Sequence, residues 1–241
     1  MLSKTRAIVL HSLPFNDKQA IIYMYTEQFG RVSYLTSRGR GKKSTLSKAL
    51  FMPLSLLELE VEHQPKRELQ RIKECRLSMP TNNIACNPIK NVVALFVSEI
   101  LYRVIRETEP DARLFQFLVQ STRILEESEQ GIANFHLVFL MGLPRYMGFF
   151  PQTDSHRRGY YFDMLNGVFI DRIPVHNHYL NRLESTILQR MLRISYENMS
   201  LYAFSRQDRI RIIERIIDYY RLHLPHFGEI KSLAVMQSLF N

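Results

Sequence analysis

The sequence predicts an α+β fold, in which a five-stranded barrel is followed by a larger all-helical domain that carries a β-hairpin. Short apolar or alternating segments separated by turn residues fill the first 80 residues. After residue 87, apolar residues recur at three- and four-residue steps, which is typical of helices. An Asn-Gly turn lies between aromatic segments near residue 166 and indicates a hairpin. We therefore expect domains at 1–80 and 81–241, with the hairpin insertion near 151–175.

Five strands are expected in the first domain, each bounded by turn-like residues. They cover residues 7–10, 20–26, 31–36, 54–61 and 69–76. Several short, closely spaced strands favour a small sandwich or barrel, because these architectures protect sheet edges. A five-stranded oligonucleotide-binding (OB) barrel is one such solution.

The second domain is predicted to be helical from its first cap. Asn87 followed by Pro88 has the pattern of an N-cap with proline at the first helical position. Ser205 with Asp208 resembles a capping box. Helices are expected over 88–107, from 111 onward, over 132–147, over 180–194 and over 205–222. The helix over 132–147 is apolar almost all round, which indicates a central position.

The composition is that of a globular protein. The chain has 241 residues, of which 46% are hydrophobic and 23% charged, so collagen-like and wholly disordered classes are excluded. No apolar run reaches the roughly 18 residues needed to span a bilayer, and the N-terminus has no secretory signal pattern, so a cytoplasmic protein without a membrane partner is expected. Two cysteines, Cys75 and Cys86, are expected to be reduced.

The charge is the first functional signal. The net charge is +9, and residues 1–80 hold 14 Lys/Arg against 7 Asp/Glu, whereas the remaining residues hold 18 against 16. The excess therefore lies in the first domain and favours a localised surface for an anionic partner.

The strongest local feature is the basic loop, which we define as residues 38–48. It lies within residues 28–57, which contain six cations and no acid: Arg31, Arg38, Arg40, Lys42, Lys43 and Lys48. Glycines between the cations let a backbone approach phosphates closely, so DNA contact is predicted, with a solvated hairpin loop as the alternative. The glycine spacing is not that of a P-loop.

A second basic run lies on the last predicted strand. Arg67, Arg71 and Lys73 share one face if the strand is regular, and either DNA contact or a plain polar outer face accounts for them. Aromatic residues on the strands offer either base-stacking surfaces or core packing: Tyr23, Tyr25 and Tyr34.

Motifs for catalysis and metal binding are absent from the sequence. It contains no nucleophile elbow, no metalloprotease motif, no dinucleotide fingerprint and no paired C-x-x-C. Two pairs of histidines, His176 with His178 and His223 with His226, lack thiolate or carboxylate partners at ligand spacing. We therefore predict no catalytic residues, no metal and no cofactor.

Several segments in order resemble the RecO family of bacterial recombination mediators. These are Ala7-Ile8-Val9-Leu10, Thr26 to Arg31, Ser37-Arg38-Gly39-Arg40, Leu143 to Pro151, Tyr161-Phe162-Asp163 and Gly167-Val168-Phe169. The resemblance implies an OB-fold domain and a helical domain. It implies binding of single- and double-stranded DNA, strand annealing and action with RecR at the bacterial nucleoid. It also implies contact with the C-terminal tail of the single-strand binding protein, which indirectly assists RecA.

The resemblance places the basic loop and Arg31 where the family's barrel is expected to meet DNA. Arginines on the predicted helices are candidates for the tail contact: Arg103, Arg106, Arg113 and Arg123. Nearby acids offset the arginines in the run from Arg206 to Arg215, so a solvated helix face with i, i+4 pairs is favoured for them. The alternative is that an arginine beside an apolar groove binds a short acidic and hydrophobic peptide.

One departure from the family concerns the hairpin. Some members hold four cysteines there in a zinc-finger-like region, whereas residues 151–158 contain none. We therefore expect packing of Tyr160, Phe162, Val168 and Phe169 to hold the hairpin.

Two other functions compete with a DNA-binding mediator. The first is a protein-interaction adaptor whose barrel binds an acidic protein, with DNA binding incidental. The second is a nuclease or phosphotransfer enzyme, which is disfavoured because residues 28–57 have no carboxylate to hold magnesium.

Overall fold

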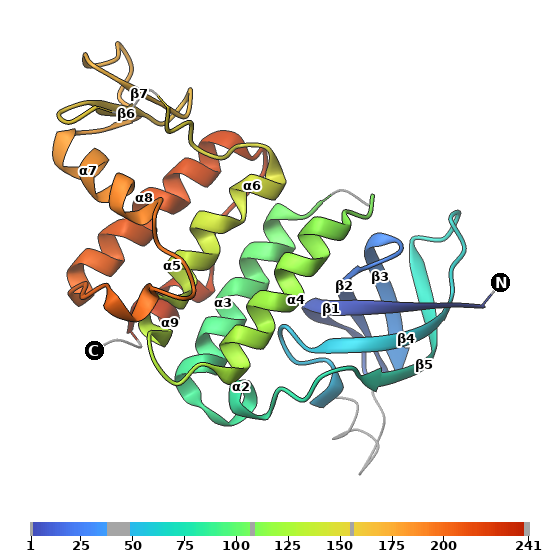
Figure 1. The fold of residues 1–241 in the computed structure, drawn as a ribbon. Helices are drawn as coiled ribbons and strands as arrows, with labels where there is room; N and C mark the ends of the chain where they lie inside the picture. The colour runs from blue at the N-terminus through green and yellow to red at the C-terminus, as the bar shows by residue number, and fades with distance from the viewer. Residues whose placement is uncertain (1, 38–48, 107–108, 155–156, 239–241) are drawn as a thin grey trace. The chain divides into compact units, whose positions relative to one another are not determined.

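The computed structural model describes residues 2–37, 49–106, 109–154 and 157–238 (Figure 1). Two compact units make up the chain, Met1–Glu127 together with Ile230–Leu239, and Ser128–Glu229 with the last two residues. The first unit thus joins the barrel to the helices that follow it. The functional division after residue 80 stays a prediction.

The first unit begins with a closed barrel in the strand order β1-β2-β3-β5-β4 (Figure 1). Its strands are β1 (Leu2–Asn16), β2 (Gln19–Thr26), β3 (Gly30–Ser37), β4 (Leu56–Glu62) and β5 (Leu69–Leu77). Only the β3–β5 pair is parallel. This architecture confirms the predicted five-stranded barrel.

Two strands, β1 and β4, differ from the expected ones by more than one residue, in each case for a backbone reason. β1 is longer than predicted because its first half pairs with β4 and its second half with β2. β4 begins at Leu56 because Leu54 has a left-handed φ of 63°, which is incompatible with an extended strand. The barrel core is formed by alternate residues of the strands, including Val9, Met24 and Leu59.

Four helices complete the described part of the first unit. They are α2 (Asn82–Cys86), α3 (Pro88–Val104), α4 (Ala112–Glu127) and α9 (Ser232–Ser238). The Asn87 side chain accepts hydrogen bonds from the backbone N–H groups of Ile89 and Lys90, so the predicted cap is confirmed.

Side chains distant in sequence bind the N-terminal ends of the two short helices. The Glu126 carboxylate accepts hydrogen bonds from the backbone of Asn83 and Ile84 at 2.8 and 2.9 Å. The Glu99 carboxylate accepts from the Ser232 backbone at 2.8 Å and from its hydroxyl at 2.6 Å. Carboxylates stabilise a helix N-terminus because the first N–H groups lack intrahelical partners.

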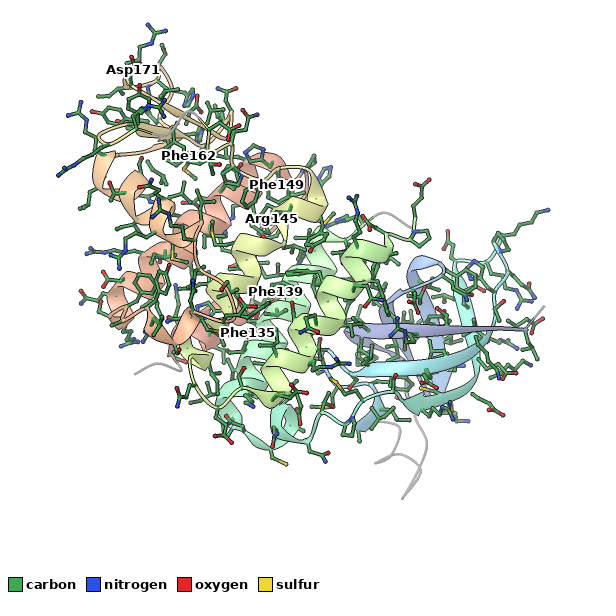
Figure 2. The ribbon with its side chains drawn as sticks, viewed as in Figure 1. Phe135, Phe139, Arg145, Phe149, Phe162 and Asp171 are labelled. Carbon is green, nitrogen blue, oxygen red and sulfur yellow. The ribbon has the colours of Figure 1, made fainter. Side chains whose placement is uncertain are left out.

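The second unit is built around α5 (Ile132–Gly142), whose Phe135 and Phe139 are buried (Figure 2). The expectation of one helix over 132–147 is wrong, because the helix divides and α6 (Pro144–Met147) follows. Pro144 has no N–H to donate to the carbonyl of Leu140. The buried Tyr220 hydroxyl donates to that carbonyl instead, at 2.8 Å.

Tyr220→Phe is expected to destabilise the protein by about 1–3 kcal/mol, because the Leu140 carbonyl would be left buried without a donor. The free energy of unfolding in urea measures this loss. Tyr202→Phe is the control, because the Tyr202 hydroxyl lies 3.4 Å from its acceptor in an exposed position. Equal losses in the two variants would contradict the role assigned to Tyr220.

The predicted hairpin is present as part of a three-stranded sheet. Its strands are β6 (Tyr161–Asp163), β7 (Val168–Ile170) and β8 (Tyr179–Leu180), in the order β7-β6-β8. Gly167 in the turn has a φ of 67°, and a Cβ there would approach the Tyr219 hydroxyl to 2.9 Å. Phe162 and Phe169 are buried with ring centroids 5.0 Å apart, so their predicted packing is confirmed.

The remaining elements of the second unit are α7 (Arg182–Met191), the 3₁₀ turn η1 (Met199–Leu201) and α8 (Arg206–His223). The predicted capping box of Ser205 and Asp208 is confirmed at the start of α8. Among the described helices, none combines the length and apolar character that a bilayer-spanning segment needs.

Candidate functional site

The basic loop lies outside the described residues. The predicted DNA contacts that fall there are Arg38, Arg40, Lys42, Lys43 and Lys48. Their assignment therefore continues to rest on sequence.

The other predicted cations of the barrel lie on or beside β5. Arg71 is exposed and follows the buried Gln70, so it points to the outside of the barrel. Lys73 is also exposed, at a register shift in the β4–β5 ladder, and lies 3.9 Å from the Glu62 carboxylate. Arg67 belongs to the turn before the strand rather than to the strand itself. The structure thus places Arg71 and Lys73 outside the barrel and Arg67 just before them.

The turn that carries Arg67 is fixed by the side chain of Gln70. Its amide donates to the carbonyls of Gln64 at 2.7 Å and Arg67 at 2.6 Å, and its oxygen accepts from the Gln64 N–H at 2.9 Å. Because Gln70 is only 3% exposed, these bonds hold the turn from inside the barrel. No sequence pattern pointed to this role.

Arg31 packs against α3 within the first unit. Its guanidinium lies 4.6 Å from the Tyr102 ring centroid and 5.5 Å from that of Tyr23. It donates to the Tyr102 carbonyl at 2.9 Å and also to that of Ile105. Burial lowers the pKa of the guanidinium, whereas the neighbouring tyrosines favour its charged form. A cation at the last carbonyls of a helix stabilises its C-terminus, so this arrangement supports a structural role for Arg31.

The strand tyrosines pack inside the protein and do not form a stacking surface for bases. Tyr34 and Tyr25 are 0% and 1% exposed. The Tyr25 hydroxyl accepts from the Asp111 N–H at 2.8 Å. Tyr23 contacts the Tyr102 ring edge-on, with centroids 5.0 Å apart. Of the two alternatives for these residues, packing is confirmed.

Ion pairs neutralise the barrel side formed by β1, β4 and β5. Arg6 donates two hydrogen bonds to Glu27, at 2.8 and 2.5 Å, and Arg76 donates two to Glu58 at the same distances. The hydrogen bond from Arg6 lowers the pKa of Glu27. Paired charges release few counterions to a polyanion, so this side is a poor phosphate surface.

The four helical arginines proposed for a protein tail do not gather at an apolar site. Arg103 lies 3.8 Å from Glu99, and the Arg106 side chain donates to the Arg103 carbonyl. Arg113 and Arg123 are exposed on α4, and Arg113 lies 3.9 Å from Asp111. Arg103 lies on α3, Arg106 just after its end, and Arg113 and Arg123 on α4.

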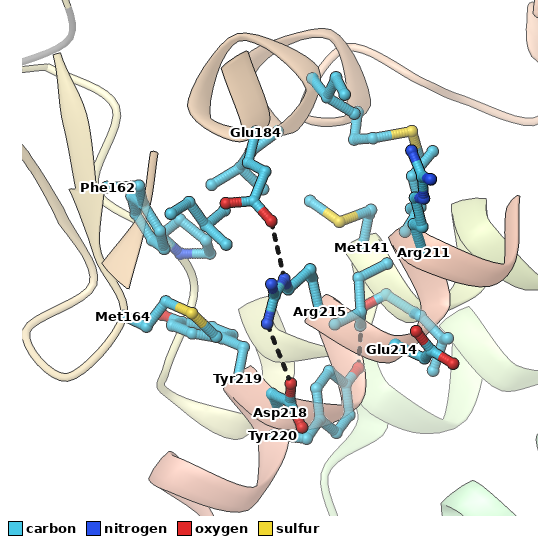
Figure 3. A pocket seen from close by; sticks show the side chains of 18 of the residues that line it. Met141, Phe162, Met164, Glu184, Arg211, Glu214, Arg215, Asp218, Tyr219 and Tyr220 are labelled. Atoms are coloured by element: carbon cyan, nitrogen blue, oxygen red, sulfur yellow. Dashed lines mark hydrogen bonds and ion pairs between the residues drawn. The ribbon is translucent and has the colours of Figure 1, made fainter. Parts of the chain in front are cut away.

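The second unit contains an apolar cavity of about 610 Å³ (Figure 3). Side chains of α5, β6, α7 and α8 line it, among them Met141, Phe162, Ile187 and Ile212. Leu183, at the start of α7, lines the same cavity and is 73% exposed. A large apolar side chain exposed beside an apolar cavity is typical of a surface that binds a partner.

Two arginines of α8 reach the rim of this cavity (Figure 3). Arg215 is bound to Glu184 at 2.9 Å and lies 3.6 Å from Asp218. Arg211 is exposed and forms no ion pair with the described residues. Asp208 and Glu214 also line the rim, but the Asp208 carboxylate is held by the Ser205 hydroxyl at 2.7 Å. Arg211 is therefore the rim cation available to an incoming carboxylate.

Hydrogen bonds to Asp163 hold the turn of the hairpin. Its carboxylate accepts from the backbone of Leu165 at 2.9 Å and Asn166 at 3.1 Å, and from the Asn166 side chain at 2.7 Å. The His176 ring lies 3.3 Å from the Asp163 carboxylate.

A four-cysteine zinc site does not fit this chain, whose two cysteines both precede α3. No group of three or more potential metal ligands occurs in the described ranges.

The contribution of Asp163 to stability is expected to depend on pH. Burial raises its pKa, but the bonds from Asn166 and Leu165 and the neighbouring His176 outweigh burial, so the pKa lies below the usual value of 3.8. A lowered pKa stabilises the fold above about pH 4, and the stabilisation is lost as the pH falls through the folded-state value. Asp163→Ala should therefore cost about 2 kcal/mol in urea unfolding at pH 7, and the difference from wild type should shrink below pH 4. A constant difference would contradict this.

The comparisons with known proteins agree with the barrel and the helical region. The family model described as Recombination protein O N terminal matches residues 1–80, and that described as Recombination protein O C terminal matches residues 87–234. The DNA repair protein RecO of Azobacteroides pseudotrichonymphae is 43% identical over 241 residues, that of Phocaeicola vulgatus 42% over 241, and that of Flavobacterium psychrophilum 32% over 242. Each alignment covers the whole of both chains. This chain therefore belongs to the RecO family of DNA repair proteins.

Proposed function

We propose that this chain is a non-enzymatic recombination mediator that binds single- and double-stranded DNA on its barrel and anneals complementary strands. The observation that carries the proposal is the uneven charge of the barrel. Ion pairs neutralise the side formed by β1, β4 and β5, whereas Arg71 is exposed outside β5 and the basic loop adds five cations. Arg67 and the basic loop complete the proposed DNA surface. Lys73 lies beside them, but it is paired with the Glu62 carboxylate at 3.9 Å and should contribute less.

Annealing follows from neutralisation of phosphate charge. Two single strands repel each other, and a surface that neutralises both lowers the barrier to pairing without reading their sequence. In the cytoplasm, the mediator would act with RecR and help RecA to replace the single-strand binding protein on DNA.

Fluorescence anisotropy of a labelled single strand across a salt series tests DNA binding. Affinity should fall steeply and log-linearly with salt and should differ little between sequences, because the contacts are to phosphates. Annealing is measured with two complementary strands that carry a donor and an acceptor dye. A flat salt response would contradict the proposal and favour the adaptor function.

We also propose that the cavity of the second unit receives the tail of the single-strand binding protein. Apolar side chains of the tail would enter beside Leu183, and an acidic residue or the terminal carboxylate would meet Arg211. The cavity is favoured over the four arginines on or next to α3 and α4 because it combines an apolar lining with a cation at its rim.

Arg211→Glu is expected to weaken binding of a labelled tail peptide about tenfold, because one attraction to a carboxylate becomes a repulsion. Leu183→Glu should weaken binding to a similar extent. Arg123→Glu is the matched control, with the same charge change at an exposed position on α4, and should bind the peptide normally. A loss confined to Arg123→Glu would place the tail on α4 instead. Each affinity is measured by fluorescence anisotropy.

A further inference from the structure

Phe15 is the one exposed aromatic residue among the described residues of the barrel strands. It is 54% exposed near the end of β1 and makes no ring contact with the described residues. Its neighbour Leu13 is 38% exposed. The tyrosines of β2 and β3 are packed, so Phe15 alone on these strands presents an aromatic face to solvent. Exposure of an aromatic ring costs hydrophobic free energy and is typical of a binding surface.

The local backbone holds Phe15 in place. It lies at a register shift between Pro14 and Asn16 in the β1–β2 ladder, where the extra residue is left without a partner on β2. The Asn16 side chain accepts from the Lys18 N–H at 2.9 Å and donates to the Gln19 side chain at 3.0 Å. These contacts fix the turn, so a ligand that stacks on Phe15 need not order it first.

An apolar strip crosses the outside of the barrel beside Phe15. The register pairs Leu13 with Ile21, Ile21 with Leu35, and Leu35 with Arg71. These residues alternate with core residues, so all four side chains lie on the outer face. The strip is therefore apolar across β1, β2 and β3, and it ends at the exposed Arg71 on β5.

The charges around the strip suit a nucleic acid. Arg71 is exposed at the β5 end of the strip, and Lys18 is exposed in the β1–β2 turn that follows Phe15, next to Asp17. Lys18 and Arg71 form no ion pair with the described residues. An exposed aromatic ring and an apolar strip on a surface that also carries exposed cations match a strand whose flat bases alternate with phosphates.

We propose that Phe15 stacks on an unpaired base of single-stranded DNA, while Arg71 and Lys18 meet flanking phosphates. This inference rests on the proposed DNA-binding function and adds a base-dependent contact to it. Stacking requires an accessible base face, which a closed duplex does not offer, so Phe15 would contribute to single-strand binding only.

The absence of tryptophan from the sequence allows a direct test. Phe15→Trp introduces the only tryptophan, and its fluorescence should be quenched when oligothymidylate binds. An abasic strand of equal length and charge should leave the fluorescence unchanged. Phe15→Ala should bind oligothymidylate about tenfold more weakly than wild type, with affinities for the abasic strand and for duplex DNA unchanged. Leu2→Ala is the matched control, because Leu2 is 57% exposed at the opposite end of β1.

The outcomes separate this inference from the proposed function. If wild type binds oligothymidylate and Phe15→Ala binds it equally well, stacking is overturned and DNA binding stands. If Phe15→Ala loses affinity equally for base-bearing and abasic strands, Phe15 acts through the hairpin backbone and stacking is again overturned. Failure of the wild-type protein to bind any strand at low salt would overturn both proposals. Quenching by an acidic peptide but not by DNA would identify a protein partner instead.

Discussion

A variant that loses four cations of the basic loop is expected to bind single-stranded DNA about 100- to 1,000-fold more weakly at 0.1 M salt. In this variant, alanine replaces Arg38, Arg40, Lys42 and Lys43. Each phosphate contact on a single strand contributes about 0.7 to the slope of log affinity against log salt, so four lost contacts should reduce the slope by about 3. Fluorescence anisotropy over a salt series gives both quantities.

A control variant with the same loss of charge separates a local site from a general effect. It replaces four exposed arginines of the second unit by alanine: Arg158, Arg172, Arg182 and Arg193. Long-range attraction is screened beyond about 10 Å at this salt concentration, so the control should retain nearly the wild-type slope. Equal losses in the two variants would show that net charge rather than the basic loop governs binding, and would favour the adaptor.

Arg31→Ala is expected to lower the free energy of unfolding by about 3 kcal/mol. The substitution removes charge-assisted donors to the Tyr102 and Ile105 carbonyls at the end of α3 and the cation packed on the Tyr23 and Tyr102 rings. Arg31→Lys keeps the charge but not the planar group with several donors, so an intermediate loss is expected. Urea unfolding followed by circular dichroism measures both.

Arg71→Ala is the matched control, because it removes an exposed arginine from the adjacent strand β5. The free energy of unfolding of Arg71→Ala should change by less than about 0.5 kcal/mol. Its slope of log DNA affinity against log salt should fall by about 0.7. Arg31→Ala should instead lose free energy of unfolding. At temperatures where it remains folded, the salt dependence of its DNA affinity should equal that of wild type. If Arg31→Ala is stable but has a shallower slope, the sequence-based assignment of Arg31 to the DNA surface is correct and the structural role is wrong.

Local sequence patterns predicted most of the architecture. Alternation identified the strands, and the hairpin followed from Asn166-Gly167 between aromatic segments. The caps at Asn87 and Ser205 were predictable because each acts on backbone groups two or three residues away. The break before α6 was also available from sequence, because Pro144 cannot donate within a helix.

Residues that act across long sequence distances could not be assigned in this way. Glu99 binds the start of α9 from 133 residues away. No sequence pattern near α9 could have predicted this capping interaction. Arg31 and Arg71 are both cations on barrel strands, and the sequence does not distinguish them. In the structure, α3 covers Arg31, whereas Arg71 is exposed. The exposure of aromatic residues could not be predicted either, because it depends on which strand face the core and the helices cover: Tyr25 and Tyr34 are buried, whereas Phe15 is exposed.

The sequence by itself determined the fold class, the positions of the strands and long helices, the concentration of charge in the first 80 residues and the family. Only the tertiary structure decided which cations are paired, which aromatics are exposed and where an apolar cavity opens beside Arg211. Secondary structure depends on periodicity and caps within a few residues of the chain. Exposure, pairing and cavities depend on neighbours that packing brings together from distant segments.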